Sequence, residues 1–277
     1  MHLKATIFVA AIVVSAVNCL NTDALKRFLQ LVERRRVDQG TCGVNKFNNA
    51  AQQPGALTRA LRKLLDEDEY QAVKRILGGS EARPGESPWI AYFSISLGGD
   101  MMSRCGGTLV SDQYIVTAGH CFYGDEKEGY PLVDKSKIEV YLGEHNVKEE
   151  VTESSQPKFT PEQVIIHPKY DVKDETNKND IAIVKLPQKV TFSEYIRRPC
   201  LPTFDLPASS YCVAAGWGIT GTGDVSDILK VVNLTSISNA DCAYKRGHTI
   251  YPGTLCAEAP PGVLQGDACQ VCHFAIQ

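Results

Sequence analysis

The sequence lacks an apolar run long enough to cross a bilayer, and it lacks an excess of charge of either sign. Its most apolar stretch near the N-terminus covers residues 7–17, which is shorter than the roughly 20 residues that a membrane-spanning helix needs. The 29 basic and 32 acidic residues leave a net charge of −3. Neither a membrane nor a nucleic acid is therefore indicated as a partner. We also find no internal repeat of fixed period and no low-complexity tract.

The short apolar run is typical of a secretory signal. His2 and Lys4 give it a weakly basic start, and small residues near positions 15–19 suit cleavage. We expect residues 1–19 to be a signal peptide and the protein to be secreted and extracellular. The alternative for this run is a buried N-terminal strand. Secretion permits disulfides, and the chain has ten cysteines that need partners.

Residues 20–75 differ in pattern from the rest of the chain. Apolar residues recur at helical spacing over residues 25–32 and again over residues 57–65. A loop-like stretch rich in Gly, Asn and Gln separates them. We expect a short helical or partly disordered pro-region. The basic run at residues 34–36 is either a processing site or a solvated helix end.

From residue 76 onward, short runs of β-branched and aromatic residues alternate with Gly, Pro and Asp. This pattern predicts an all-β sandwich or barrel. The strands expected from it cover residues 89–95, 114–117, 138–142, 181–186, 211–215 and 231–237.

Seven motifs in this region follow one another in a recognisable order. They are Arg75-Ile76-Leu77-Gly78-Gly79, Pro88-Trp89, Cys105-Gly106-Gly107-Thr108-Leu109, Thr117-Ala118-Gly119-His120-Cys121, Asn179-Asp180-Ile181-Ala182-Ile183-Val184-Lys185-Leu186, Arg198-Pro199-Cys200-Leu201-Pro202 and Gly216-Trp217-Gly218. Together they resemble the chymotrypsin-fold, trypsin-like serine protease zymogens, from Arg75 to Gln270. The resemblance implies two antiparallel six-stranded-type barrels, a protease domain over residues 76–277, and activation by cleavage between Arg75 and Ile76.

The resemblance also assigns catalytic roles. A serine hydroxyl is a poor nucleophile at neutral pH, so a base must take its proton. His120 is implied as that base, and Asp180 is implied as the group that orients the imidazole. Asp267 matches the position at the base of the specificity pocket, which implies cleavage after Arg or Lys.

The residues after Gln270 depart from the family pattern. Val271, Cys272 and His273 stand where the family has the Gly, Asp and Ser of Gly-Asp-Ser-Gly-Gly. This removes the nucleophile, the oxyanion-hole donors and the carboxylate that receives the new amino terminus. We expect the second barrel to be incomplete and the chain as given to be inactive. Cys272 is one residue out of register and is not expected to replace the serine.

Three interpretations remain open at this point. The chain is an incomplete product of a gene for a secreted trypsin-like endopeptidase zymogen, which we favour. Alternatively it is a secreted non-catalytic homologue with a binding or regulatory role, or a truncated product without function. A Gln codon CAG followed by the GT of a Val codon is typical of a splice donor, so we hypothesise that the last seven residues are translated intron.

By resemblance, the cysteines pair as Cys105 with Cys121, Cys242 with Cys256, and Cys42 with Cys200. The third pair would tether the pro-region after activation. Cys19 leaves with the signal peptide, and Cys212, Cys269 and Cys272 remain without assigned partners.

The remaining expectations concern glycosylation, metal binding and partners. Asn233-Leu234-Thr235 is a glycosylation sequon, although it falls in an expected strand. Glu144 with its acidic neighbours is either a calcium loop or a solvated acidic loop, of which we favour the second. The histidines at 145, 167, 248 and 273 have no metal-ligand spacing and are expected in loops or at the surface. We expect no metal and no cofactor. The expected partners are protein substrates and an activating trypsin-like protease.

Overall fold

A computed structural model describes the larger part of the chain. It covers residues 7–10, 42–43, 80–98, 101–126, 129–148, 158–174, 176–201, 206–218, 225–247 and 249–258, and of residues 7–10 only the backbone. Most of the expected pro-region, the Arg75–Ile76 junction and the segment that carries Asp267, Cys269 and Cys272 lie outside the described residues.

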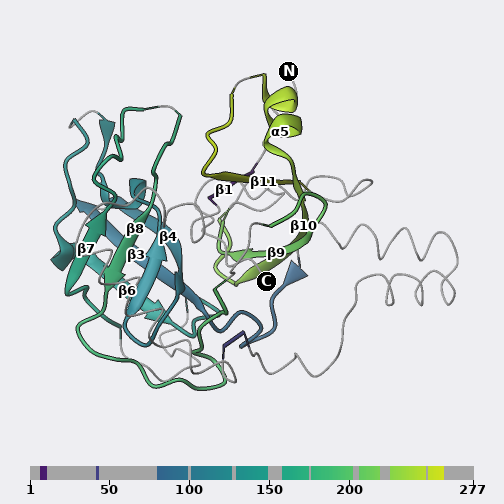
Figure 1. The fold of residues 1–277 in the computed structure, drawn as a ribbon. Coiled ribbons are helices and arrows are strands. Elements are labelled where there is room, and N and C mark those ends of the chain that lie inside the picture. Colours follow the sequence, from purple (N-terminus) through teal and green to yellow (C-terminus); the bar gives the residue numbers. More distant parts are fainter. Residues whose placement is uncertain are drawn as a thin grey trace, which may run out of the picture.

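The first sheet contains six antiparallel strands in the order β6-β3-β4-β5-β8-β7 (Figure 1). Their bounds are β3 Ile90–Gly98, β4 Met101–Leu109, β5 Tyr114–Thr117, β6 Ile138–Leu142, β7 Gln163–Ile166 and β8 Ala182–Lys185. Val140 of β6 exchanges two backbone hydrogen bonds with Phe159, which lies just before β7. This bridge joins the two ends of the sheet, so the strands close into a barrel.

Alternation of side chains builds the core of this barrel. Along β6, Ile138, Val140 and Leu142 are buried while the residues between them are partly exposed. Phe93 of β3 is fully buried and packs edge-to-face on Phe122, with ring centroids 6.2 Å apart. Phe122 belongs to η1, the 3-10 turn His120–Phe122, so the core directly supports the segment that carries His120.

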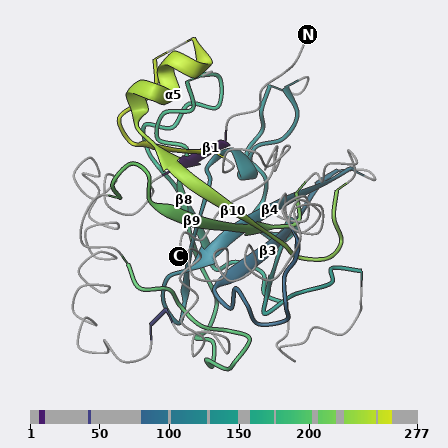
Figure 2. The ribbon, with the colours of Figure 1, turned by 90° about the vertical axis from the view of Figure 1, so that its right-hand side faces the viewer.

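The second sheet contains five strands (Figure 2). They are β1 Ile7–Ala10, β2 Ser80–Glu81, β9 Tyr211–Gly216, β10 Lys230–Ile237 and β11 Thr254–Glu258. Strand β10 is central, because it pairs with β2, β9 and β11, and β1 pairs with the outer edge of β11. β1 falls within the expected signal peptide, at the run for which an N-terminal strand was the alternative.

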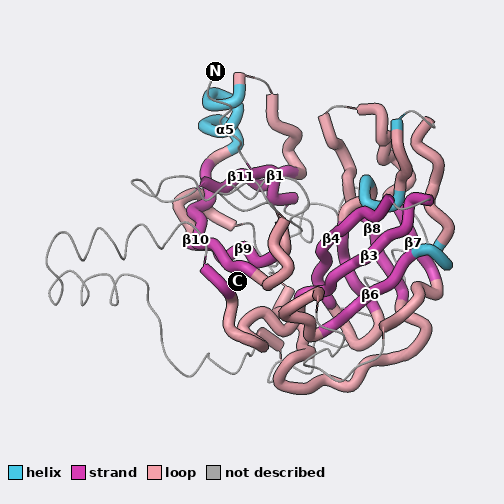
Figure 3. The backbone as a smooth tube through the Cα atoms, turned by 180° about the vertical axis from the view of Figure 1, so that it is seen from behind, coloured by secondary structure: helices cyan, strands magenta, loops and turns pink. Residues whose placement is uncertain are grey.

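Within the described residues, the second sheet is accompanied by the α-helix α5, Asn239–Arg246 (Figure 3). The Ser238 hydroxyl accepts the backbone N–H of Asp241 at 3.0 Å and caps its first turn. Gly247 ends the helix in the left-handed conformation, with φ of 74°. A disulfide between Cys242 and Cys256 fastens α5 to β11.

The barrel and the second sheet meet around Trp217. This side chain is buried, packs against Tyr92 of β3 with ring centroids 5.3 Å apart, and donates its indole N–H to the carbonyl of His145 at 3.1 Å. Ala82, Ile90 and Leu229 complete the contact. The barrel and the second sheet are therefore held together by apolar packing and by several hydrogen bonds, among them the backbone N–H of Leu229 to the carbonyl of His145 at 2.8 Å and that of Val147 to the carbonyl of Asp227 at 2.9 Å.

The observed architecture confirms the all-β fold. His145 and His167 lie in loops, as one of the two expected placements, and both are buried, with 8% and 7% of their surfaces exposed. Glu144 is also buried, at 6% exposure, and its carboxylate accepts the backbone N–H of His145 at 3.1 Å. It is therefore not a solvated acidic side chain. No helix among the described residues is long and apolar enough to cross a membrane.

Candidate active site

Strand pairing explains why His120 and Asp180 meet although 60 residues separate them. Strands β5 and β8 run antiparallel, with Thr117 opposite Ala182. In an antiparallel pair the chain that leaves one strand lies beside the chain that enters the other. His120 follows Thr117 by three positions and Asp180 precedes Ala182 by two, so both fall at the same end of the pair.

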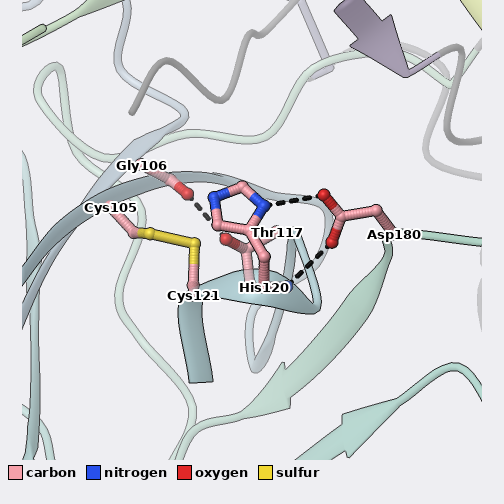
Figure 4. Close-up of a disulfide and its surroundings, with 6 residues drawn as sticks. All are labelled: Cys105, Gly106, Thr117, His120, Cys121 and Asp180. Carbon is pink, nitrogen blue, oxygen red and sulfur yellow. Dashed lines mark hydrogen bonds and ion pairs between the residues drawn. A yellow bond between two sulfur atoms is a disulfide. The ribbon is translucent and has the colours of Figure 1, made fainter. Parts of the chain in front are cut away.

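His120 makes a two-point contact with the Asp180 carboxylate, one from its ring and one from its backbone (Figure 4). The Nδ1 atom of His120 lies 2.7 Å from Oδ2 of Asp180, and the backbone N–H of His120 donates to Oδ1 at 2.8 Å. An ionised carboxylate only accepts hydrogen bonds, so Nδ1 carries the imidazole proton and Nε2 is left as the basic nitrogen. The arrangement therefore holds the ring in the tautomer that a general base needs.

Solvent access differs between the two groups. The His120 side chain is 47% exposed, whereas the Asp180 side chain is 16% exposed. The carboxylate is thus enclosed while the imidazole faces outward. Such an arrangement lets the ring receive a proton from a reactant on its open side, with the carboxylate behind it to stabilise the imidazolium.

A strained residue positions Asp180. Asn179 directly before it has φ of 58°, in the left-handed region that Asn tolerates better than most residues. Its carbonyl accepts the N–H of Ile181 at 2.7 Å, and its side-chain amide donates to the carbonyl of Lys169 at 3.3 Å. These contacts turn the chain sharply just before β8, so that the Asp180 carboxylate is directed toward His120.

Tyr170 encloses the same region. Burial raises the pKa of its phenol above the ordinary value, and the negative charge of Asp180 raises it further. The ring lies against Gly119, where an added Cβ would approach the Tyr170 ring carbon Cδ1 to 2.9 Å. A glycine is needed before His120 because the aromatic ring occupies the space that a side chain would fill.

The segment that carries His120 is fixed from its other side by covalent and polar contacts. Cys105 of β4 and Cys121 form a disulfide, and both cysteines are 3% exposed. The buried Thr117 hydroxyl donates to the carbonyl of Gly106 at 2.7 Å. Together with the burial of Phe122, these contacts fix the backbone on both sides of the imidazole.

The grouping of Cys105, His120 and Cys121 is not a metal centre. Their ligand atoms lie within 4.8 Å of one another. The two sulfurs are bonded to each other, however, and a metal binds cysteine as a thiolate.

The remaining residues predicted from the sequence are the other disulfide cysteines, the glycosylation asparagine, the activation junction and Asp267. The structure joins Cys42 to Cys200 and Cys242 to Cys256, and the described part of the chain contains one unpaired cysteine, Cys212, which is buried. Asn233 lies on β10, where its side-chain oxygen accepts the Tyr211 hydroxyl. Arg75, Ile76 and Asp267 lie outside the described residues.

Sequence reasoning did not single out Tyr170, Gly119 or Asn179 as separate contributors. Gly119 and Asn179 stand next to His120 and Asp180 inside the motifs already noted, so their positions offered a signal. Tyr170 offered none, because its contact with Gly119 depends on the fold and not on local sequence.

Comparisons with known proteins agree with this geometry. Residues 76–270 match the protein family described as Trypsin. Trypsin-1 of Astacus astacus is 31% identical over 197 residues, covering 70% of this chain and 78% of that protein. Trypsin-1 of Salmo salar is 37% identical over 171 residues, covering 60% of this chain and 62% of that protein. Serine protease 1 of Homo sapiens is 31% identical over 216 residues, covering 76% and 75%. With its paired His120 and Asp180 at the meeting point of β5 and β8, this chain belongs to the trypsin family of serine proteases.

Proposed function

We propose that this chain has the framework of a secreted trypsin-like endopeptidase zymogen and that, with its present residues 271–273, it does not hydrolyse peptide bonds. The observation that supports the endopeptidase framework is the 2.7 Å contact between His120 Nδ1 and Asp180 Oδ2. An imidazole held in this tautomer is useful for taking a proton from a serine hydroxyl and later giving it to the leaving amine.

The proposed lack of hydrolysis rests on three residue types. Val271, Cys272 and His273 stand where the family pattern places Gly, Asp and Ser. Without that serine, His120 has no hydroxyl to deprotonate. Without that glycine turn, the backbone N–H groups that would stabilise the oxyanion are not arranged for it.

Processing of the chain follows the same proposal. Residues 1–19 act as the signal peptide, residues 20–75 as the pro-region, and a trypsin-like protease cuts between Arg75 and Ile76. The disulfide between Cys42 and Cys200 then keeps the pro-region attached to the protease domain. The protein is secreted, and in its catalytic form it acts on protein substrates without a cofactor.

Two further residues receive roles in this proposal. Asp267 gives the catalytic form its preference for Arg and Lys, because a carboxylate in the pocket pairs with a basic side chain. Asn233 carries an N-linked glycan. In support of the second role, the Tyr211 hydroxyl donates to the Asn233 side-chain oxygen, a contact that leaves the amide nitrogen available for the sugar.

A second candidate is a non-catalytic homologue that binds a partner or regulates another protease. The observation that favours it is the replacement of all three functional positions by Val271, Cys272 and His273. The barrels and the enclosed Asp180 would then serve as a scaffold.

A grafting experiment separates the two candidates. Residues from 271 onward are replaced by the family segment that begins Gly-Asp-Ser-Gly-Gly, and the product is cleaved at Arg75 and assayed on an Arg-ester substrate. We expect hydrolysis that His120→Ala abolishes and whose basic preference is lost in Asp267→Ser. A grafted chain that folds and yet hydrolyses nothing contradicts the endopeptidase framework and favours the binding homologue.

A further inference from the structure

Strand β9 has one neighbour in the described part of the chain. It pairs with β10 at six positions, from Tyr211 opposite Thr235 to Gly216 opposite Lys230 (Figure 2). β2 and β11 also pair with β10, but along its other edge, because Lys230 and Thr235 each have a second partner there. Among the described residues, the outer edge of β9 is therefore open. An open edge presents unpaired N–H and C=O groups to another extended chain.

The composition of β9 suits this edge to pairing. Its sequence, Tyr-Cys-Val-Ala-Ala-Gly, contains no Pro and no charged side chain. Pro and charged residues are the usual means by which edge strands avoid a further neighbour. Main-chain pairing is how extended peptides add to such an edge, with the alternate side chains giving specificity.

β9 also carries the unpaired cysteine of the described residues. Cys212 is 2% exposed and lies with Ala214 in the core of the second sheet. The other described cysteines are all bonded, including Cys256 of β11, which is joined to Cys242. A thiol is therefore available on β9 and not on β11.

The run at residues 271–276 has the features of a strand that fits this edge. It reads Val-Cys-His-Phe-Ala-Ile, which includes β-branched and aromatic residues and no Pro or Gly. Side chains alternate between the two faces of a strand, so Cys272, Phe274 and Ile276 would share one face. That face is apolar and would continue the buried face of β9 on which Cys212 lies.

The chain leaves β11 close enough to β9 for this run to reach it. Thr235 of β10 lies opposite Glu258 on one edge and opposite Tyr211 on the other. Two strand spacings, about 10 Å, therefore separate Glu258 from Tyr211. Residues 259–270 span up to roughly 40 Å when extended, which is enough to carry the run to the outer edge of β9.

We propose that the outer edge of β9 is a strand-acceptor site, that the chain's own residues 271–276 occupy it, and that Cys272 forms a disulfide with Cys212. This gives the run a structural role that goes beyond the proposed protease framework. The oxidant is a small disulfide such as oxidised glutathione. Cys272 and Cys212 each displace one glutathione, so the two protons and two electrons that they lose leave with two glutathione thiols.

Peptide mapping of the full chain tests the disulfide. The protein is folded in a mixture of reduced and oxidised glutathione and mapped without reductant. We expect a peptide in which Cys212 is joined to Cys272, and a free Cys212 in the Cys272→Ser variant. Cys269→Ser removes the neighbouring cysteine, is the matched control and should leave the link in place. A free Cys212 in the unaltered chain, or a Cys212 joined to Cys269 or to a second copy of the chain, overturns the proposal.

Hydrogen exchange tests the strand pairing separately. Phe274→Pro removes one backbone donor from the run and should speed exchange at the β9 amides by roughly tenfold. Val263→Pro, in the segment before the run, is the matched control and should leave exchange at β9 unchanged. Equal exchange at β9 in the two variants overturns the proposal. Because neither readout involves hydrolysis, failure here is distinguishable from failure of the protease proposal.

Discussion

Removal of the disulfide beside His120 gives the most informative perturbation of the site. The change is Cys105→Ala together with Cys121→Ala, so that no free thiol is introduced. The two cysteines are separated by 16 positions in the sequence. By the loop-entropy relation, a closed loop of this size stabilises the folded state by about 3 kcal/mol. For a domain of this size, the corresponding fall in Tm is about 6–12 °C.

The structure also predicts which backbone amide becomes more mobile when this disulfide is removed. The Cys105–Cys121 bond anchors the residue next to His120, whose backbone N–H donates to Asp180. We expect the double variant to show faster hydrogen exchange at the His120 amide. The matched control is Cys242→Ala with Cys256→Ala, which opens a separation of 14 positions between α5 and β11 beside the second sheet. It should lose a similar free energy of unfolding, about 3 kcal/mol, without changing exchange at His120.

Equilibrium unfolding in urea and amide exchange measure the two effects. A loss below about 1 kcal/mol in the Cys105 and Cys121 variant would refute the loop argument. Unchanged exchange at His120 would show instead that the β5–β8 pairing and the buried Phe122 hold the segment without the disulfide.

Three other predictions follow from the same description. Trypsin treatment should produce a new N-terminus reading Ile-Leu-Gly-Gly-Ser from cleavage after Arg75, and the pro-region should separate on a gel only after reduction of Cys42–Cys200; a dominant cut at residue 36, or separation without reductant, contradicts this. Burial, and after it the charge of the neighbouring lysine, lowers the pKa of His167 below 6.5. At a pH between the two pKa values, the folded protein therefore binds fewer protons than the unfolded chain. The free energy of unfolding thus keeps its full value above the ordinary pKa of histidine and falls as the pH drops toward the lowered pKa of the folded state. His167→Gln should flatten urea stability between about pH 7 and pH 5, and an unaltered slope counts against it. Gly119→Ala places a Cβ 2.9 Å from a ring carbon of Tyr170 and should cost about 1–3 kcal/mol by the same unfolding assay, whereas a neutral result would show that the ring moves freely.

The local sequence pattern was sufficient to predict the position of several strands. The runs at residues 114–117 and 138–142 were predicted with the bounds that β5 and β6 have. Alternating β-branched residues predict a strand directly, because one face of each strand packs on the core and the other faces outward. The paired cysteines and the His and Asp motifs were likewise visible, through the family resemblance.

Other elements depend on contacts that local sequence does not contain. β4 was not predicted as a strand, and Cys105-Gly106-Gly107-Thr108-Leu109 was noted only as a family motif. A Cβ at Gly107 would come within 2.8 Å of both Ile115 and Phe93, so the glycine is required by tertiary packing. Helix α5 was also missed, since its only buried residue is Cys242 and it has no apolar stripe. Its Ser cap and C-terminal Gly were the signals available.

The contact that defines the site was beyond local reasoning for a different reason. Residue types identified His120 and Asp180, but their distance is set by the register of β5 on β8, and register between strands this far apart in sequence follows from the whole barrel. Tyr170 was missed for the same reason.

Hydrolysis of an Arg ester by the full chain, cleaved at Arg75 and measured beside its His120→Ala variant, tests the central claim most directly. We predict that both proteins show only the background rate, because Val271, Cys272 and His273 replace the Gly, Asp and Ser that would supply the nucleophile and the oxyanion hole. Hydrolysis above background that His120→Ala abolishes would contradict it and would identify a nucleophile, with Cys272 the first residue to replace.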